Sequence, residues 1–248
     1  MIDSCIHFKK NKLKFISKIS EKLSSSKINF ALAMYDYEKS LKNRKIFYDN
    51  CKKFKNLIPV AFLRDVNNVK KEINNILKLK YKFVKIHPRM LKRNLNDEKF
   101  YTKVFKELNK TNLTILWCTF DGWENKASEI NQLEFISKLI NLTKKNKIIL
   151  MHGGGPNIIK YYEKFRFIKR VYLDLSYTLH HYYESSVEKD IIFLMKRFDQ
   201  RLLVGTDFPT ISLEKHSKIL NKIIKKSKLN NFKKKNILYK NLEKIINI

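Results

Sequence analysis

The sequence predicts an α/β protein, a single (β/α)8 TIM barrel that covers residues 1–248. Three observations carry this prediction. Eight short apolar runs alternate with amphipathic helical patterns along the chain, and 248 residues suit eight strand-plus-helix units. Only 5 Gly and 4 Pro are present, which argues against a turn-rich all-β fold. A doubly wound sheet shares this alternation and stays open as an alternative, because periodicity does not decide whether a parallel sheet closes.

The predicted strands are the eight apolar runs, which cover residues 2–8, 28–34, 58–63, 83–87, 113–118, 148–152, 171–176 and 202–207. Between them, apolar residues recur at i, i+3 and i+4, which is typical of helices with one buried face. These helices cover residues 13–23, 69–79, 100–108, 133–142, 158–167 and 187–198, and two more follow the last strand at 213–227 and 236–246. Residues 35–47 are polar and predict a long loop that leads into a short helix at about residues 46–54.

Charge and composition restrict the partners. The formal net charge of +30 is a balance that can accompany binding to nucleic acids or anionic membranes. The lysines are spread through nearly every polar segment without a recognition motif, so we expect a solvated basic surface and no specific nucleic-acid site. No apolar run approaches the ~20 residues of a membrane helix, and the first residues do not resemble a signal peptide. Three widely spaced cysteines argue against a disulfide framework, and we expect a cytoplasmic protein without membrane contact.

Polar residues gather along and at the ends of the predicted strands. On the first strand Asp3, Cys5 and His7 are expected to share one face, because residues two apart on a strand point the same way. Further residues of this kind occur on or directly after the fourth to eighth strands: Lys85, His87, Cys118, His152, Asp174, Ser176 and Asp207. The second and third strands lack such an end. Since parallel strand ends converge on one mouth of a barrel, four residues are expected to surround one cavity: Cys5, His7, His152 and Asp207.

Four short motifs occur in a fixed order: Asp-x-Cys-x-His at 3–7, Val-Lys-Ile-His-Pro at 84–88, Met-His-Gly-Gly at 151–154 and Val-Gly-Thr-Asp-Phe-Pro at 204–209. Together they resemble the amidohydrolase-related family of metal-dependent barrels. The resemblance is closest to its amidohydrolase 2 branch, which includes decarboxylases of the aminocarboxymuconate-semialdehyde type. Residues 236–242 are similar to the closing helix of the family, so the resemblance extends over essentially the whole chain.

The chain departs from the family at two ligand positions. The first strand of the family carries His-x-His and its fifth strand ends in a ligand His, whereas Cys5 and Cys118 stand at the matching positions here. The resemblance implies one divalent ion, and sulfur ligands favour zinc. The expected ligands are Cys5, His7, Cys118 and Asp207. The alternative is that both cysteines are small buried hydrophobic residues and that the metal site is lost.

The resemblance also implies catalytic roles. Asp207 resembles the general base of the family, and His152 resembles its donor to the developing oxyanion. The expected substrate-binding residues, suited to a carboxylate or phosphate group or to orienting the ligands, are Lys85, His87, Arg89, Asp174 and Ser176. Structural alternatives stay open for His87, as a cap of its strand, and for Lys85, as a partner of Asp174 or as a carbamylated metal bridge.

Other residues carry weaker expectations. His180 and His181 lie in a Tyr-rich segment and are expected at the surface or in a lid, whereas His216 and Cys51 fall in helical patterns and are expected to be structural. Phe120, Trp117 and Trp123 flank the fifth-strand loop, where either a pocket floor or core packing would suit them. Specificity is expected to depend on residues 121–130 and 177–186.

The sequence thus predicts a metal-dependent hydrolase that acts on a small anionic substrate through a metal-activated water. Two alternatives from other classes stay open: a decarboxylase (lyase) of the same barrel family, and a catalytically silent barrel that binds a small ligand. A small molecule is the expected partner, and a homo-oligomer is left open.

Overall fold

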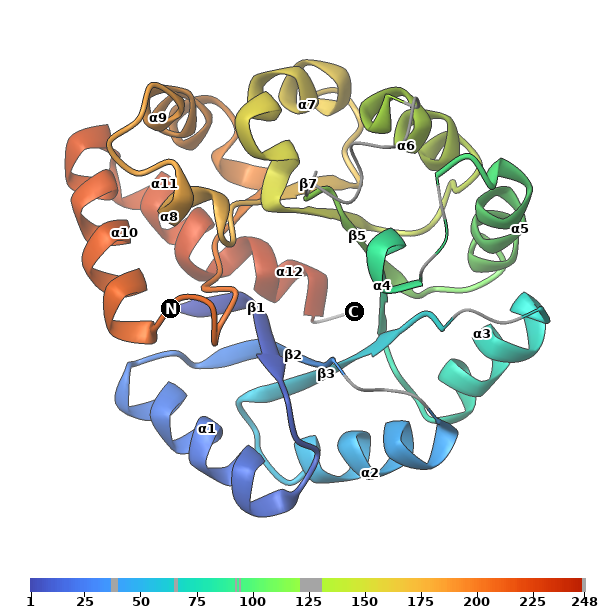
Figure 1. Cartoon of the computed structure of the whole chain (residues 1–248). Helices are drawn as coiled ribbons and strands as arrows, with labels where there is room; N and C mark the ends of the chain where they lie inside the picture. The colour runs from blue at the N-terminus through green and yellow to red at the C-terminus, as the bar shows by residue number, and fades with distance from the viewer. Residues whose placement is uncertain (37–39, 65–66, 92, 94, 121–130, 247–248) are drawn as a thin grey trace.

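The structure is a computed structural model that describes residues 1–36, 40–64, 67–91, 93, 95–120 and 131–246. Eight strands form one sheet in chain order, and each is parallel to its neighbour. They are β1 (Ile2–Phe8), β2 (Phe30–Tyr35), β3 (Leu57–Phe62), β4 (Phe83–Ile86), β5 (Thr114–Cys118), β6 (Ile148–Met151), β7 (Val171–Asp174) and β8 (Leu202–Leu203). Figure 1 is a view along the axis of the barrel, with the strands at the centre and the helices in a ring around them. The predicted (β/α)8 architecture is confirmed.

The sheet closes between its first and last strands. β8 is short, but the chain continues beside β1 as far as Phe208. The Ser4 backbone N–H donates to the Val204 carbonyl at 3.1 Å, and the Asp207 N–H donates to the Cys5 carbonyl at 2.9 Å. These bonds remove the open edge that a doubly wound sheet would have.

The closing segment needs a glycine. A Cβ on Gly205 would lie 2.6 Å from Ser4 Oγ and 2.9 Å from the Cys5 backbone nitrogen, distances that side chains do not tolerate. A hydrogen at this position lets the last segment approach β1 closely enough for the two to exchange backbone hydrogen bonds.

The main helices of the outer ring match the predicted amphipathic patterns to within a few residues at each end. They are α1 (Leu13–Ser25), α3 (Val69–Lys78), α5 (Glu98–Leu108), α6 (Gln132–Asn141), α7 (Ile158–Phe165), α9 (Val187–Arg197) and α10 (Leu213–Ser227). Shorter elements are α4 (Pro88–Leu91), α8 (Thr178–His181), α11 (Asn231–Lys235), η2 (His152–Asn157) and η3 (Asp199–Arg201). The predicted last helix is a π-helical turn, η4 (Asn236–Lys240), that continues into α12 (Asn241–Ile246).

The connection after β2 differs from the prediction. A helix, α2 (Leu41–Cys51), begins where a loop was expected, and Ser40 caps it by accepting from the Asn43 N–H. Its buried face carries Arg44, which is fully buried and whose Nη2 donates to Glu72 on α3 at 2.7 Å. A charged residue at a core position hides the apolar period, and this is why the sequence pattern indicated a loop.

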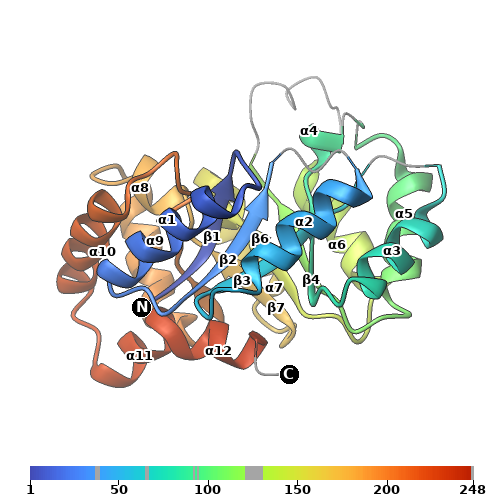
Figure 2. The same cartoon turned by 90° about the horizontal axis from the view of Figure 1, so that it is seen from below.

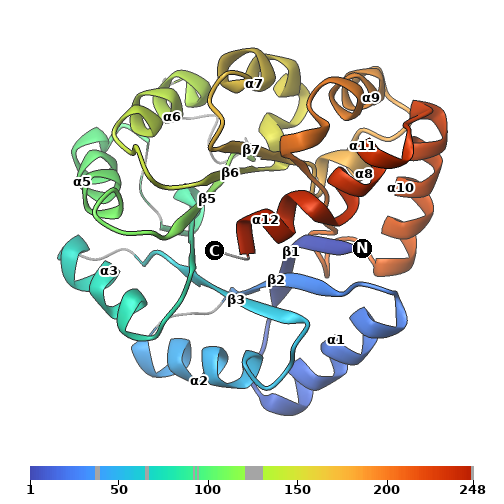
Figure 3. The ribbon, with the colours of Figure 1, turned by 180° about the vertical axis from the view of Figure 1, so that it is seen from behind.

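Apolar side chains fill the inside of the barrel, and α12 covers its lower end. Inward-facing residues such as Leu32, Val60 and Leu116 form one cluster with Leu242 and Ile245 of α12. Figures 2 and 3 show α12 lying across the end of the barrel at which the strands begin. The opposite end, where the strands finish, is therefore the end left for a site. Within the described residues, no helix is both long and apolar enough to cross a membrane.

Candidate active site

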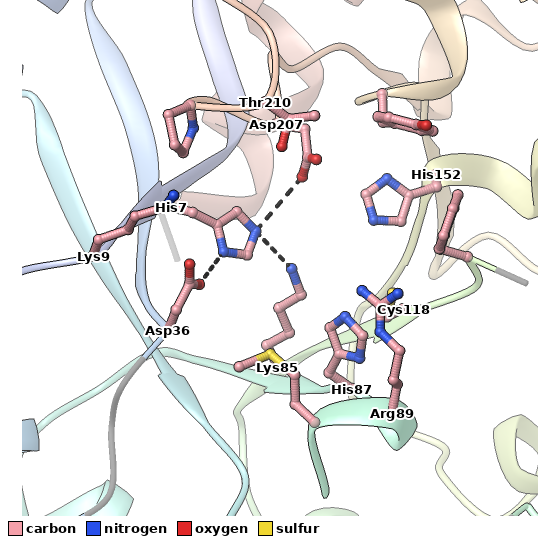
Figure 4. A pocket seen from close by; sticks show the side chains of 14 residues that line it. His7, Lys9, Asp36, Lys85, His87, Arg89, Cys118, His152, Asp207 and Thr210 are labelled. Carbon is pink, nitrogen blue, oxygen red and sulfur yellow. Dashed lines mark hydrogen bonds and ion pairs between the residues drawn. The ribbon is translucent and has the colours of Figure 1, made fainter. Parts of the chain in front are cut away.

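A cavity of about 640 Å³ opens where the strands finish (Figure 4). Several of the predicted site residues line it: His7, Lys85, His87, Arg89, Cys118, His152 and Asp207. They come from the ends of β1, β4, β5 and β6, from α4, and from the segment that closes the barrel. Phe120 also contributes to the wall, whereas Trp117 packs in the core between barrel and helices. Trp123 and the loop 121–130 lie outside the described residues.

Three possible metal ligands meet at one side of the cavity. The ligand atoms of Cys5, His7 and Asp207 all lie within 4.8 Å of one another. The Cys5 thiol donates to Asp207 Oδ1 at 3.2 Å, and His7 Nε2 lies 3.6 Å from the same oxygen. Sulfur, imidazole nitrogen and carboxylate oxygen together form a donor set that zinc accepts.

Asp36, just after β2, orients the ring of His7. Its carboxylate is hydrogen-bonded to His7 Nδ1, so Nε2 faces Lys85 and Asp207 (Figure 4). A carboxylate behind a histidine in this way is the usual arrangement at metal sites, because it fixes the tautomer and the ring plane. The prediction that the second strand lacks a polar end was wrong. A signal was present, since Asp36 lies two residues after the second predicted run, which ends at residue 34.

Lys85 lies beside the three-donor group, that is, the possible metal ligands Cys5, His7 and Asp207. Its Nζ is 3.2 Å from His7 Nε2, and it does not pair with Asp174 in the way the sequence allowed. Burial would lower the pKa of Lys85, but the surrounding acidic groups, Cys5 first among them, raise it instead. The ammonium group therefore supplies a positive charge at this corner of the cavity, and an ion bound there would have to share the donors with it.

The first strand does not present its three polar residues to one place. The register between β1 and β2 shifts between Asp3 and Ile6, so that β1 carries one extra residue. Asp3 accepts from the backbone N–H groups of Cys5 and Thr206 and from the Thr206 hydroxyl, and it does not reach the three-donor group. Burial raises the pKa of Asp3 to about 7, although these hydrogen bonds oppose the shift. Its place is in the seam between the first and last strands.

Asp174 and Ser176 lie beneath the cavity. Both side chains are fully buried, and neither is among the described residues that line the cavity. Asp174 accepts from the hydroxyls of Ser4 and Ser176, and it also accepts from the His152 backbone N–H at 3.4 Å. The geometry thus gives the two residues a supporting place beneath His152, in keeping with the orienting role left open beside substrate contact.

His152 reaches the cavity from the end of β6 in a fixed orientation. Its Nδ1 lies 2.9 Å from the Ser176 carbonyl, which fixes the hydrogen on Nδ1 and leaves Nε2 as the second ring nitrogen. Burial would lower the pKa of His152, but the Cys118 sulfur and then Asp207 outweigh burial and raise it to about 9. The ring is consequently a cation at neutral pH.

Cys118 stands apart from the three-donor group. Its contacts are with His87 and His152, which lie on either side of it at the ends of β4 and β6. Burial would raise the pKa of the Cys118 thiol, yet the two imidazoles hold it well below its usual value. The pKa of Cys5 moves the other way and lies well above its usual value, chiefly because of burial. Of the four expected ligands, Cys5, His7 and Asp207 thus lie together, and Cys118 lies apart from them.

Three residues that line the cavity have left-handed backbone conformations. The φ angles are +64° at His152, +63° at Tyr177 and +59° at Asp207. Such conformations are uncommon for residues other than glycine and cluster where a side chain must be held in one direction. Beside His152, Gly154 also has positive φ, and a Cβ there would lie 2.2 Å from the Tyr161 ring.

The remaining histidines separate into a buried pair and a rim residue. His180 Nε2 lies 2.8 Å from His216 Nδ1, and both rings are buried, so the expected surface position of His180 was wrong. The Tyr-rich segment turns inward there because Leu179 packs in the core. His181 is exposed and stacks on Tyr177. His216 and Cys51 are buried within helices, as predicted for structural residues.

Solved structures with this fold come from several bacteria. An uncharacterised TIM-barrel protein from Bordetella bronchiseptica is 15% identical, with a TM-score of 0.77 over 93% of this chain and 82% of that one. A probable 2-pyrone-4,6-dicarboxylic acid hydrolase from Acinetobacter baumannii, with citric acid bound, is 12% identical, with a TM-score of 0.70 over 100% and 99%. Dihydroorotase from Campylobacter jejuni is 15% identical, with a TM-score of 0.71 over 100% and 83%. At these identities the likeness shows the fold.

The family follows from the sequence itself. No curated protein matches the chain. The family model described as Amidohydrolase, of the amidohydrolase 2 type, matches residues 45–245 and so includes three of the four motifs. The chain belongs to the amidohydrolase family.

Proposed function

We propose that this protein is a hydrolase that acts on a small anionic substrate bound in the cavity at the barrel mouth. One observation carries the proposal: Asp207 and His152 line the same cavity, and their pKa values are moved in opposite directions. Burial would raise the pKa of Asp207, but the charges of His152, His7 and Lys85 outweigh burial and lower it. A carboxylate and an imidazolium thus face one substrate site at neutral pH.

The two groups have complementary roles. Asp207 is a proton acceptor, suited to deprotonating water as it attacks a carbonyl carbon. His152 is a proton donor, suited to stabilising the developing oxyanion and to protonating the leaving atom. Their strained backbone conformations and the hydrogen bond from His152 to Ser176 hold both side chains in place.

The charge of the cavity wall favours an anionic substrate. Lys9, Lys85 and Arg89 line the cavity, and the carboxylates among the described lining residues are Asp36 and Asp207, both of which are bonded to or close to His7. Guanidinium and ammonium groups bind carboxylates and phosphates through charge-assisted hydrogen bonds. The Acinetobacter baumannii relative with citric acid bound agrees with this substrate class.

A divalent ion is part of the proposal. Cys5, His7 and Asp207 would hold it, and the thiol favours zinc over magnesium or manganese. When bound, such an ion supplies Lewis acidity beside Asp207. The Asp36 hydrogen bond fits this role, because it directs the His7 Nε2 lone pair toward the other two donors.

A substrate panel tests the proposal. Purified protein, with and without added zinc, is incubated with small lactones, imides and N-acyl amino acids that carry one or two carboxylates, and with their neutral methyl esters. We expect turnover of carboxylate-bearing compounds, incorporation of one ¹⁸O atom from labelled water, and loss of turnover in Asp207→Asn. Asp49→Asn is a matched control, because Asp49 lies exposed on α2 and pairs with Lys45 away from the cavity.

Two results would contradict the hydrolase. Release of carbon dioxide without ¹⁸O incorporation would identify a lyase instead. Equal rates in wild type and Asp207→Asn across the panel would mean that the observed turnover does not come from this site.

A further inference from the structure

The structure holds a cysteine flanked by two histidines on neighbouring strands. Cys118 is the last residue of β5, the strand between β4 and β6. In the register of the sheet, Trp117 pairs with Ile86 and Cys118 pairs with Met151, so that His87 and His152 directly follow the pairing partners. All three side chains line the cavity (Figure 4). The register of the sheet thus brings the cysteine and the first residue after each neighbouring strand to the same level of the barrel.

The surroundings of Cys118 are those of a nucleophilic thiol. The thiolate is the reactive form of cysteine, and it is stabilised next to imidazolium or ammonium groups. His87 and His152 both interact with the Cys118 sulfur, and Lys85 contributes a further positive charge nearby. Cys51, in contrast, is enclosed by apolar residues between α1 and the barrel, where burial raises the pKa of its thiol. Of the three cysteines, Cys118 is the one that lines the cavity and lies between two imidazoles.

We propose that Cys118 is a catalytic nucleophile that accepts the acyl group of the substrate as a thioester. This step deepens the proposed function and rests on it for turnover, whereas the reactivity of the thiol does not depend on it. The hydrolase would then work in two steps at one cavity: formation of the thioester, in which His152 acts, and its hydrolysis, in which Asp207 acts.

The proton and electron balance closes within the site. The Cys118 sulfur attacks the acyl carbon, the bond from that carbon to the leaving oxygen or nitrogen breaks with its electron pair, and the His152 imidazolium protonates the leaving atom. Water then attacks the thioester carbon while Asp207 takes its proton, and the sulfur leaves as a thiolate. Return of that proton from Asp207 to His152 restores the starting state. Lys85 is placed to stabilise the oxyanion in both steps.

Alkylation tests the nucleophile without a substrate. Iodoacetamide is added to the folded protein near pH 6, and the modified peptides are quantified by mass spectrometry. We expect Cys118 to react about a hundredfold faster than an ordinary thiol at this pH, because the flanking imidazoles hold the pKa of its thiol well below the usual value. Cys51 is the internal control and should stay unmodified. The ratio of the alkylation rate with iodoacetate to that with iodoacetamide should be higher for Cys118 than for glutathione. Lys85 and Arg89 line the same cavity, and their positive charges attract the carboxylate of iodoacetate.

The histidine variants make the test specific. His152→Asn and His87→Asn should each slow alkylation of Cys118 at pH 6, and Cys51→Ser should leave it unchanged. Modification of Cys118 no faster than that of Cys51, or rates unaffected by both histidine variants, would overturn the proposal.

Acyl transfer is tested with p-nitrophenyl acetate. We expect a burst of up to one p-nitrophenolate per chain and an acetyl group on the Cys118 peptide that neutral hydroxylamine removes, with both absent in Cys118→Ser. Acetylation confined to lysines, which hydroxylamine does not reverse, would contradict the thioester.

The substrate panel separates this inference from the proposed function. Equal turnover by wild type and Cys118→Ser, with loss in Asp207→Asn, would overturn the thioester and keep the hydrolase. Reversible acylation of Cys118 without turnover of any panel compound would keep the nucleophile and overturn the proposed substrate class.

Discussion

Cys5 of β1 and Cys118 of β5 both lie near the cavity, yet the pKa values of their thiols are moved in opposite directions. The Cys5 thiol donates to the Asp207 carboxylate, and its pKa lies well above the usual value because it is buried. Cys118 lies between two imidazoles that hold its pKa well below that value. From sequence the two residues were equivalent candidates for a metal ligand. The difference arises from neighbouring strands, which a linear pattern does not display.

This difference leads to a prediction about zinc. Cys5→Ser should reduce the zinc retained by purified protein, because a hydroxyl is a poorer ligand than a thiolate. Cys118→Ser should leave the zinc content close to that of wild type, because Cys118 stands apart from the three donors. Elemental analysis of protein purified without added metal measures both. Equal losses of zinc in the two variants would mean that Cys118 is a zinc ligand as well.

Lys85 competes for the same donors, which gives a second prediction. Lys85→Met removes an ammonium group that lies 3.2 Å from His7 Nε2. Zinc should bind at least about tenfold more tightly, since a like charge at this distance opposes the ion. Competition with a chromogenic chelator measures the affinity. Weaker binding in Lys85→Met would instead support the carbamylated bridge that the sequence left open.

The charge state of His152 gives a third prediction. With a pKa raised to about 9, the ring is protonated below that pH, so hydrolysis should fall as the pH rises through about 9. Because Cys118 is the largest cause that raises this pKa, Cys118→Ser should bring it back toward about 6.5. Proton NMR of the imidazole as a function of pH reports the value without any need for turnover. An unchanged pKa in the variant would show that Cys118 is not its partner.

At the scale of elements, the seam between β1 and the closing segment carries the buried carboxyl of Asp3. Its pKa is about 7 when folded and 3.8 as its ordinary value, so between these limits the folded state holds a proton that the unfolded state lacks. The contribution of Asp3 to stability is therefore greatest below about pH 4, and it falls as the pH rises toward 7. Above pH 7 the loss is complete.

Asp3→Asn removes this titration. We compare the free energies of unfolding of wild type and variant. Their difference, wild type minus variant, should fall by about 4 kcal/mol between pH 4 and pH 8, which is the free energy that corresponds to the pKa difference of Asp3. Urea unfolding at a series of pH values measures it, and the subtraction cancels the titration of other groups. A difference that stays level with pH would mean that Asp3 titrates normally in the folded protein.

Strands and most helices of this protein could be predicted from the sequence, because apolar periodicity follows from burial. The first part of helix α2 could not, since Arg44 occupies a core position that a period analysis counts as polar. The extra residue in β1 could not be predicted either, because a bulge depends on the pairing with β2. Within the site, strand ends predicted the cavity, while its division into a three-donor group and a Cys–His cluster required the positions of neighbouring strands.

At the scale of the whole molecule, the charge of +30 gives a further prediction. Lysines distributed over the polar segments should bind duplex DNA weakly and without sequence preference at low salt. Binding should vanish near physiological salt, because such affinity comes from the release of counterions. Fluorescence anisotropy with two unrelated duplexes at two salt concentrations measures this. Retention of one duplex at the higher salt would reveal a specific nucleic-acid site.

The contact between β1 and residues 204–208 also shapes the synthesis of the protein. Cys5 and Asp207 are 202 positions apart, so the ribosome makes nearly the whole barrel before they can meet. Until then β1 is paired with β2 alone, and its other side presents free backbone groups on which a second nascent chain can add a strand. Closing contacts of such long range also form slowly. We therefore expect this barrel to pass through a prolonged open stage in which it needs protection from aggregation, and its candidate active site to be among the last parts to form.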